Sequence, residues 1–171
     1  AAFAVGSFVR ELGSDMGGAQ VGTVGKLDLF PDLVNVVAGT ATLTVDLRNT
    51  DAALLEEAEG RLAAFVADLA TREGVTITSR TLARFDPVAF DPAMIDLVES
   101  TAVRLGHSVR RMPSGAGHDA QMMARICPTA MIFVPSVKGI SHNPREHTGP
   151  ADLLRGANVL LDVLLALAAE P

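Results

Sequence analysis

A short run near the first third of the chain alternates apolar and polar residues without a break, and this alternation restricts the fold more than any other feature. The run spans residues 40–48, TATLTVDLR. Its apolar members are Ala41, Leu43, Val45 and Leu47, and threonine, aspartate and arginine fill the other positions. Because successive side chains of a β-strand point to opposite faces, this period predicts a strand with one face on a core and the other towards solvent or a ligand.

Helical and extended patterns surround this strand in a definite order. An amphipathic helix, predicted to end near Gly13, comes first, and strands follow at Val21–Phe30 and within Leu33–Asn49. A long helix that ends at Gly74 comes next, and Val75–Ser79 alternates again as a strand. The order helix–strand–strand–helix–strand is that of a split βαββαβ sandwich without its first strand. We therefore expect an α+β domain here.

The second half of the chain predicts a different architecture. The dipeptide Asp86-Pro87 marks a boundary, so that we expect one domain at residues 1–87 and another at 88–171. Helices and strands alternate in the second domain, as in part of a parallel α/β layer, and the whole chain is assigned to the α/β class. The elements expected there are a helix from Asp91 to Gly106, a strand at Ser108–Met112, a helix to about Arg125, a strand at Ala130–Val134 and a helix at Leu153–Ala168.

Composition excludes several classes of partner. The net charge is -6 and no Lys/Arg cluster is present, which argues against nucleic acid. The longest apolar stretch, Val159–Ala169, is too short to span a bilayer, and the N-terminus lacks a basic leader. With one cysteine, Cys127, the chain cannot form an internal disulfide, and a reducing cytoplasmic setting fits. The first helix has no N-cap residue before it, so we expect that the chain begins inside a fold.

The first candidate site residue is His118, which lies in the Gly-rich turn SGAGHDA before a predicted helix. Gly115 and Gly117 would let the backbone approach a ligand closely, and a helix N-terminus favours an anion. The His118 imidazole could then donate to a carbonyl oxygen that becomes negative during nucleophilic attack. The alternative is a helix-capping or core histidine.

A second candidate, His142, lies in the polar loop GISHNPREHT after a predicted buried strand. Active-site residues gather at such strand ends in α/β layers. Glu146 could orient a metal-ligating histidine without touching the metal. No HExxH motif is present, so the sequence holds no self-contained metal motif of that kind. The alternatives are an exposed loop histidine and a solvated glutamate.

Long ordered motifs carry a family resemblance. The stretch at residues 114–148, with GHDA, FVPS and GISHNPRE in order, resembles the carbamoylase, hydantoinase and allantoate-amidase group of the M20 metallopeptidase superfamily. The earlier motifs VNVV and DLR resemble the lid strands of the same group. The resemblance covers nearly the whole chain. It implies a lid or dimerisation domain at 1–87 and the C-terminal part of a catalytic zinc-hydrolase domain at 88–171.

The resemblance also implies a role for each matching residue. His142 becomes a metal ligand, and His118 becomes a catalytic residue that binds substrate, together with Gly117, and stabilises the transition state. Asn35 and Arg48 become lid residues that hold the substrate's carboxylate. A guanidinium suits a bidentate grip on a carboxylate, which agrees with Arg48 lying on the polar face of its strand.

Two of these roles have plain alternatives. Arg48 could be a solvated charge at a strand end, paired to Asp46 or to a nearby acid. Asn35 could be an amide beside a turn, which its spacing fits equally well.

The implied activity is cleavage of a carbamoyl, ureido or amide C–N bond in a small substrate that carries a carboxylate, such as an N-carbamoyl amino acid or allantoate. The implied cofactor is a divalent metal, zinc first, with manganese, cobalt or nickel as alternatives. The implied assembly is a homodimer through the lid. A catalytic zinc needs about three protein ligands, and the sequence offers His142 alone. We therefore expect a fragment that is inactive by itself and binds metal weakly.

Two other functions remain open. A peptidase or deacylase of the same superfamily would keep the metal and change the substrate. A non-catalytic α/β module would dimerise through its exposed sheet and bind no metal.

Overall fold

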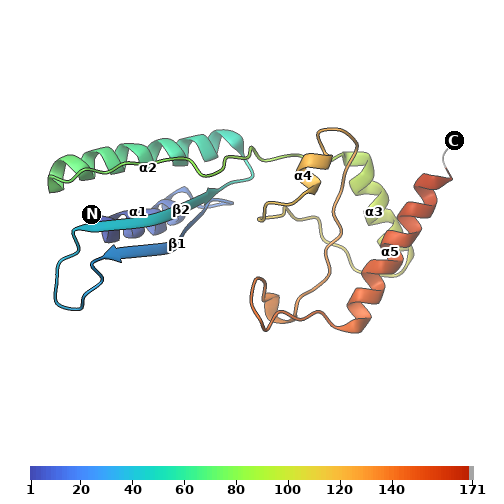
Figure 1. Ribbon diagram of the computed structural model, residues 1–171. Coiled ribbons are helices and arrows are strands. Elements are labelled where there is room, and N and C mark those ends of the chain that lie inside the picture. Colours follow the sequence, from blue (N-terminus) through green and yellow to red (C-terminus); the bar gives the residue numbers. More distant parts are fainter. Residues whose placement is uncertain (170–171) are drawn as a thin grey trace. The chain divides into compact units, whose positions relative to one another are not determined.

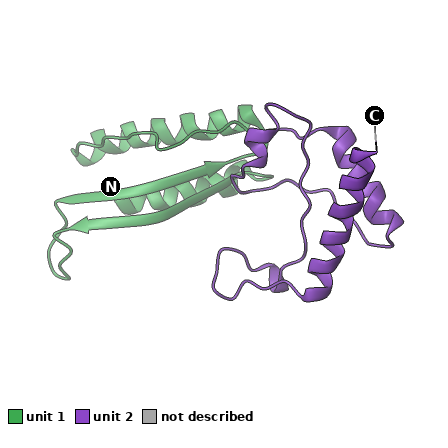
Figure 2. Ribbon diagram, turned by 45° about the vertical axis from the view of Figure 1, so that its right-hand side comes forward, with its two compact units in different colours: residues 1–87 green, residues 88–171 purple. Residues whose placement is uncertain are grey.

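The computed structural model describes residues 1–169, and the chain divides into two compact units, Ala1–Pro87 and Val88–Pro171 (Figures 1 and 2). The division falls directly after the Asp86-Pro87 dipeptide. Each unit has its own hydrophobic cluster. Helices and strands occur together in the chain, which agrees with the expected α/β class.

Unit 1 contains two helices and one β-hairpin. Helix α1 (Ala2–Met16) leads into strand β1 (Val21–Phe30), strand β2 (Thr40–Arg48) follows, and helix α2 (Ala52–Glu73) comes last. The strands pair antiparallel from Val21 opposite Arg48 to Phe30 opposite Thr40, with a β-bulge between Val24 and Lys26. The predicted strand Val21–Phe30 is confirmed, and the strand expected within Leu33–Asn49 is β2.

Local chemistry explains where the helices begin and end. The Asp51 carboxylate accepts hydrogen bonds from the backbone N–H groups of Ala53 and Leu54, which caps the start of α2. Gly74 adopts a left-handed backbone at the C-terminus of α2, as predicted. Helix α1 continues past Gly13 to Met16, because the residue with positive φ that ends it is Gly17.

One apolar layer holds unit 1 together. Val5 and Val9 of α1 and Leu69 of α2 are buried, and the inward side chains of β2 that pack on them are Leu43, Val45 and Leu47. These three confirm the predicted core face of β2, whereas Ala41, nearer the hairpin loop, is exposed. A Cβ atom on Gly22 would lie 2.9 Å from the Val9 backbone oxygen, so glycine is needed where α1 meets β1.

Between Val88 and Ala169, unit 2 has four helical elements: α3 (Pro92–Arg104), α4 (Ala120–Met123), the 3-10 turn η1 (Val137–Gly139) and α5 (Pro150–Ala168). The N-cap of α3 is Asp91, as predicted. Its core is the seam between α3 and α5, where Ala102, Val159 and Val163 are buried. An ion pair between Arg104 and Asp162, at 2.9 Å, also joins the two helices.

Three predicted strands are not strands in the structure. Val75–Ser79, Ser108–Met112 and Ala130–Val134 carry no ladder hydrogen bonds, and β1–β2 is the one sheet found within residues 1–169. An alternating or apolar run predicts which faces are buried, and a strand also requires a neighbouring backbone to pair with. Ile77 still packs on the core of unit 1. The predicted burial of Val75–Ser79 is therefore confirmed at Ile77, whereas the predicted strand pairing is wrong.

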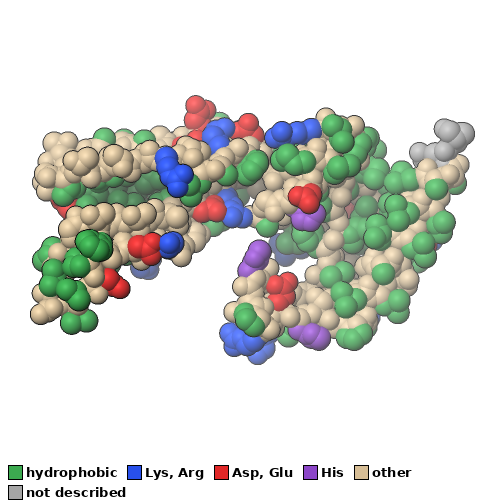
Figure 3. All heavy atoms as spheres, in the orientation of Figure 1, with side chains coloured by type: hydrophobic (Ala, Val, Ile, Leu, Met, Phe, Trp, Pro, Cys, Tyr) green, Lys and Arg blue, Asp and Glu red, His purple; other side chains and the backbone are tan. Residues whose placement is uncertain are grey.

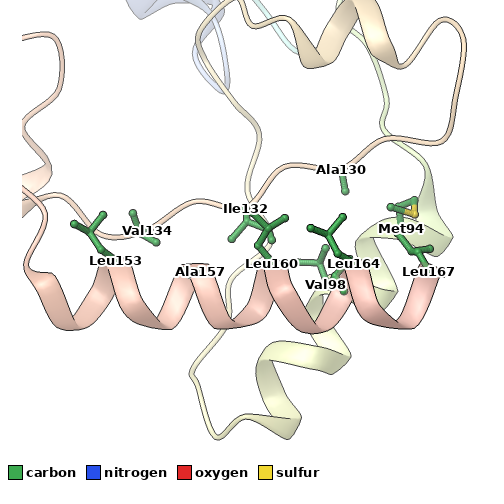
Figure 4. A pocket seen from close by; sticks show the side chains of 12 residues that line it. Met94, Val98, Ala130, Ile132, Val134, Leu153, Ala157, Leu160, Leu164 and Leu167 are labelled. Carbon is green, nitrogen blue, oxygen red and sulfur yellow. The ribbon is translucent and has the colours of Figure 1, made fainter. Parts of the chain in front are cut away.

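The segment Ala130–Val134 runs along α5 (Figure 4). Ala130, Ile132 and Val134 line a groove of about 390 Å³ between this segment, α3 and α5, and every lining residue is apolar or glycine. No backbone group of residues 130–134 hydrogen-bonds another residue of the described chain. The segment therefore has the side-chain packing of a strand with both backbone edges unpaired.

Helix α5 is apolar on more than the side that it buries. Val159 and Val163 face the core, and leucines are exposed elsewhere along the helix. The exposed leucines are Leu153, Leu154, Leu160, Leu161, Leu164 and Leu165. Even so, among residues 1–169 no helix combines the length and the hydropathy that crossing a membrane requires.

Gly156 sets how closely α5 can lie to the extended segment. A Cβ atom at Gly156 would be 2.4 Å from Cγ1 of Val134, so we predict that Gly156→Ala destabilises unit 2 by about 1–3 kcal/mol. Alanine has the better helix propensity, and the matched control Gly60→Ala, in α2 with open space around it, should therefore stabilise the chain by about 0.5–1 kcal/mol. Thermal and urea unfolding measure the free energy of unfolding of both variants. Equal changes in this free energy for Gly156→Ala and Gly60→Ala would contradict the close packing of α5 on Val134.

Candidate functional site

The turn that carries His118 is held by hydrogen bonds to the first residues of α4. The His118 Nδ1 atom accepts a hydrogen bond from the Ala120 backbone N–H at 3.0 Å. The His118 backbone N–H donates to the Gln121 side-chain oxygen at 3.4 Å, and its carbonyl accepts from the Gln121 N–H at 2.9 Å. The imidazole itself is exposed. This turn therefore fixes the ring through one nitrogen and leaves the other towards solvent.

Helix α4 is shorter than expected. It covers Ala120–Met123, and turns continue the chain to Cys127 instead of a helix to Arg125. A single helical turn has little macrodipole, so the expected anion-favouring helix end is not what positions His118. The individual N–H group of Ala120 does this.

Gln121 also holds this turn, which the motif did not lead us to expect. Its side chain reaches back to the backbone N–H three positions earlier, at His118. The three-residue spacing is like that of a capping box, in which a Glu or Gln side chain reaches back in the same way, although the N-cap of α4 is Asp119, one position after His118. The signal was present in the sequence, but histidine stands where the motif has serine or threonine.

Gly117, directly before His118, adds no side chain beside the imidazole. Gly117 is exposed, and a Cβ atom there would meet only the Gln121 side-chain oxygen, at 3.9 Å. Neither Gly115 nor Gly117 has a positive φ. Glycine is therefore not required by the backbone at Gly117, and its effect is to leave room beside His118.

His142 occupies an unusual backbone conformation. Its φ is 54°, in the left-handed region that disfavours a residue with a Cβ atom. The Glu146 carboxylate accepts a hydrogen bond from the His142 backbone N–H at 2.8 Å. Glu146 thus holds the His142 residue through its backbone N–H.

Further hydrogen bonds shape the His142 loop. The Asn143 side-chain oxygen accepts from the Arg145 backbone N–H at 3.0 Å, and the Asn143 carbonyl accepts from the Glu146 N–H at 2.9 Å. The Val137 N–H donates to the His147 carbonyl at 2.8 Å, which closes the loop at its base. His142 is therefore exposed on a loop with a defined shape.

The hairpin of unit 1 separates Asn35 from Arg48. Asn35 is an exposed turn residue in the loop beyond the Phe30–Thr40 pair, whereas Arg48 pairs with Val21 at the other end of the strands. At about 3.3 Å per residue, the length of β2 puts them on the order of 25 Å apart. One carboxylate cannot contact both residues of a single chain.

Arg48 is engaged with Asp46 on the exposed face of β2. Its Nε and Nη2 atoms donate to the two Asp46 carboxylate oxygens at 2.8 and 2.7 Å. This hydrogen-bonded pair lowers the pKa of Asp46 and raises that of Arg48. The pairing is the alternative that the sequence left open, and a substrate carboxylate at Arg48 would compete with Asp46.

The described residues do not by themselves make a metal site. Within 1–169, no group of three or more His, Cys, Asp or Glu side chains is arranged to hold an ion. His118 and His142 belong to the same unit, and no hydrogen bond or shared partner joins them. A catalytic zinc takes about three protein ligands, which is more than residues 1–169 bring together at any one place.

The Asp46–Arg48 pair predicts a pH dependence. Because the folded-state pKa of Asp46 is lowered, its stabilisation is complete above the unfolded-state value of about 3.9 and is lost as the pH falls through the folded value. Both side chains are about half exposed, which limits the effect to about 0.2–1 kcal/mol.

NMR titration of the Asp46 carboxyl carbon tests this pair. Arg48→Gln should return the Asp46 pKa towards its ordinary value. The control Arg72→Gln, which breaks the separate ion pair with Asp68, should leave the Asp46 titration unchanged. An Asp46 curve unaffected by Arg48→Gln would contradict the pairing.

The Glu146 contact predicts a local effect at His142. Glu146→Ala removes the acceptor of the His142 backbone N–H, so amide hydrogen exchange at His142 should accelerate several-fold. Glu146→Gln keeps an oxygen acceptor of similar shape and should preserve most of the protection. If His142 exchanged in Glu146→Ala at the rate of the unaltered chain, Glu146 would not hold this loop.

Comparisons with known proteins place the chain in a family. The model of peptidase family M20/M25/M40 matches residues 3–166. The chain is 38% identical to an N-carbamoyl-L-amino-acid amidohydrolase of Rhizobium meliloti, over 86% of this chain and 36% of that protein. It is 39% identical to an allantoate amidohydrolase of Escherichia coli, over 90% of this chain and 37% of that protein.

A solved structure gives the same result. The fold matches the crystal structure of a hydantoinase/carbamoylase family amidase from Burkholderia vietnamiensis with a TM-score of 0.94 and 39% identity, over 99% of this chain and 41% of that one. The chain spans little more than a third of the length of the curated relatives named above. These matches confirm the resemblance expected from GHDA and GISHNPRE, and the chain belongs to peptidase family M20/M25/M40.

Proposed function

We propose that this chain forms part of a metal-dependent amidohydrolase that cleaves the C–N bond of a carbamoyl, ureido or amide group in a small substrate with a carboxylate. The observation that carries the proposal is the fold match over 99% of the chain to an amidase of the hydantoinase/carbamoylase family. The names of the relatives, which act on N-carbamoyl amino acids and allantoate, support the substrate class.

Within this proposal, His118 is the catalytic residue of unit 2. Its exposed imidazole, beside the uncovered backbone of Gly117, donates a hydrogen bond to the carbonyl oxygen of the substrate. A donor placed where negative charge develops stabilises the transition state more than the ground state. Unit 2 thus supplies the C-terminal part of the catalytic domain.

His142 is the proposed metal ligand, and Glu146 holds it in place through the backbone N–H. An imidazole ligand suits zinc, with manganese, cobalt or nickel as other candidates. Because the described residues form no ligand cluster around His142, these 171 residues bind metal weakly and do not hydrolyse substrate alone. We place the working protein in the cytoplasm.

Unit 1 is the proposed lid and dimerisation domain. Asn35 and Arg48 both contact the carboxylate of a substrate only if they come from two copies, because the hairpin keeps them apart in one chain. A homodimer through unit 1 places Asn35 of one copy and Arg48 of the other at a single site. Arg48 exchanges its bond to Asp46 for a bond to the substrate carboxylate.

One observation favours a second candidate function, a dimerisation module without catalysis. Hydrophobic side chains gather at the hairpin end of unit 1, at the left of Figure 3. Val34 and Val37 there are almost fully exposed. The exposed apolar side chains of this end are Phe30, Leu33, Val34, Val36 and Val37. Such a patch is typical of an interaction surface, and an interaction surface is all that a dimerisation module needs.

A chimera separates the two functions. The matching segment of the Rhizobium meliloti amidohydrolase is replaced by this chain, and hydrolysis of an N-carbamoyl-L-amino acid is measured together with metal content. We expect the chimera to retain turnover, whereas the 171-residue chain with added Zn²⁺ should show none. A chimera that folds, dimerises and binds metal but does not turn over would favour the module.

Variants of the chimera test the histidines. His142→Ala should lower the bound metal and reduce turnover at least about a hundredfold, in the range that loss of a metal-site group produces. The control His147→Ala removes another exposed histidine of the same loop and should leave both values unchanged. Equal effects of the two substitutions would remove His142 from the proposed metal site.

A further inference from the structure

The hydrogen bond at His118 determines which ring nitrogen carries the proton. Nδ1 accepts from the Ala120 backbone N–H at 3.0 Å, and an amide nitrogen acts here only as a donor. Nδ1 must therefore be unprotonated. In a neutral imidazole one nitrogen is a donor and the other an acceptor, so the proton lies on Nε2.

We infer that the Ala120 N–H locks His118 as the Nε2–H tautomer, which makes His118 a fixed hydrogen-bond donor and prevents it from ligating a metal. Nε2 has no partner among residues 1–169 and the ring is exposed, so its N–H is available to a ligand. The ligand class is a carbonyl or carboxylate oxygen, because Nε2–H can only donate.

The exclusion of metal ligation follows from the same bond. A metal-ligating histidine binds through one nitrogen and donates its other N–H to an acceptor. At His118 the nitrogen that would have to donate faces a donor instead, the Ala120 N–H. A metal bound at Nε2 would put the ring proton on Nδ1, where it would face the Ala120 backbone N–H. A metal bound at Nδ1 would take the place of the Ala120 N–H. Both modes require this turn to open.

Gln121 supports the lock from the other side. Its side-chain oxygen accepts from the His118 backbone N–H, and its own N–H donates to the His118 carbonyl. The His118 backbone is thus held at both its N–H and its carbonyl while the ring is held by Ala120. The Ala120 backbone N–H, together with the side chain and backbone N–H of Gln121, positions His118.

The role as a donor to substrate rests on the proposed function, whereas the tautomer does not. The direct test is NMR on the 171-residue chain with ¹⁵N label, at about pH 8, above the ordinary histidine pKa of about 6.5. A through-hydrogen-bond nitrogen–nitrogen coupling between His118 Nδ1 and the Ala120 amide should be present, with the ring proton on Nε2. A protonated Nδ1, or two averaged tautomers without the coupling, would overturn the inference.

Two substitutions of Ala120 test the source of the lock. Ala120→Gly keeps the amide donor and should keep the coupling and the Nε2–H tautomer. Ala120→Pro removes the donor at the first position of a helix, where proline is tolerated, and should let His118 populate both tautomers. Proline also restricts the preceding Asp119, so the unaltered chain and the glycine variant decide the matter if the proline variant does not fold.

Zn²⁺ added to the labelled chain tests the exclusion of metal ligation. The coupling and the ring shifts of His118 should not change at Zn²⁺ concentrations that move the shifts of other histidines. Loss of the coupling together with a zinc-dependent shift of His118 would overturn the exclusion.

The chimera then tests the donor role. A glutamine amide reaches about as far as Nε2, whereas the shorter asparagine amide reaches about as far as Nδ1. His118→Gln should therefore retain kcat at least about tenfold better than His118→Asn, with similar KM. Equal losses would overturn the donor role, and an inactive chimera that carries His118 would overturn the proposed function and leave the tautomer standing.

Discussion

Every backbone N–H and C=O group removed from water needs a partner, and this requirement separates the two units. In unit 1 the hairpin meets it locally, because β1 and β2 are close in sequence and pair along their whole length. The paired strands then offer one apolar face to α1 and α2. Within residues 88–169 no two extended segments pair, and the core of unit 2 depends on contacts between α3, α5 and the Ala130–Val134 segment.

The same requirement explains which elements could be predicted from the sequence. The bounds of α2 follow from Asp51 and Gly74, whose capping chemistry is local. The apolar pattern of Ala130–Val134 correctly predicts that this segment packs against its surroundings. The same pattern wrongly predicts a strand, because no other segment pairs with it. Periodicity reports on burial, and pairing depends on residues far away in the sequence. This is why the helices match the prediction better than the strands of unit 2.

The candidate site shows the same division. The positions of His118 and His142 in their turns were predictable from glycine spacing and motif order. Their hydrogen bonds were not, because they depend on rotamers and on single backbone groups. The Glu146 carboxylate accepts from the His142 backbone N–H, a contact that the motif does not specify, and Gln121 was not expected at all. The opposite placement of Asn35 and Arg48 follows from the hairpin register, which the alternating pattern alone does not give.

The contact between Gly156 and Val134 has a consequence for the loop between them. Val134 is the last residue before this loop and Gly156 lies in the second turn of α5, so their contact brings both anchors of the loop together. The lack of a Cβ atom at Gly156 therefore allows the two ends of the loop at residues 135–149 to lie close together, and His142 belongs to this loop. A larger side chain at position 156 would push α5 away from Val134 and so move the two anchors apart. The two ends of the loop that carries His142 are thus held near each other by a glycine that lies outside the loop.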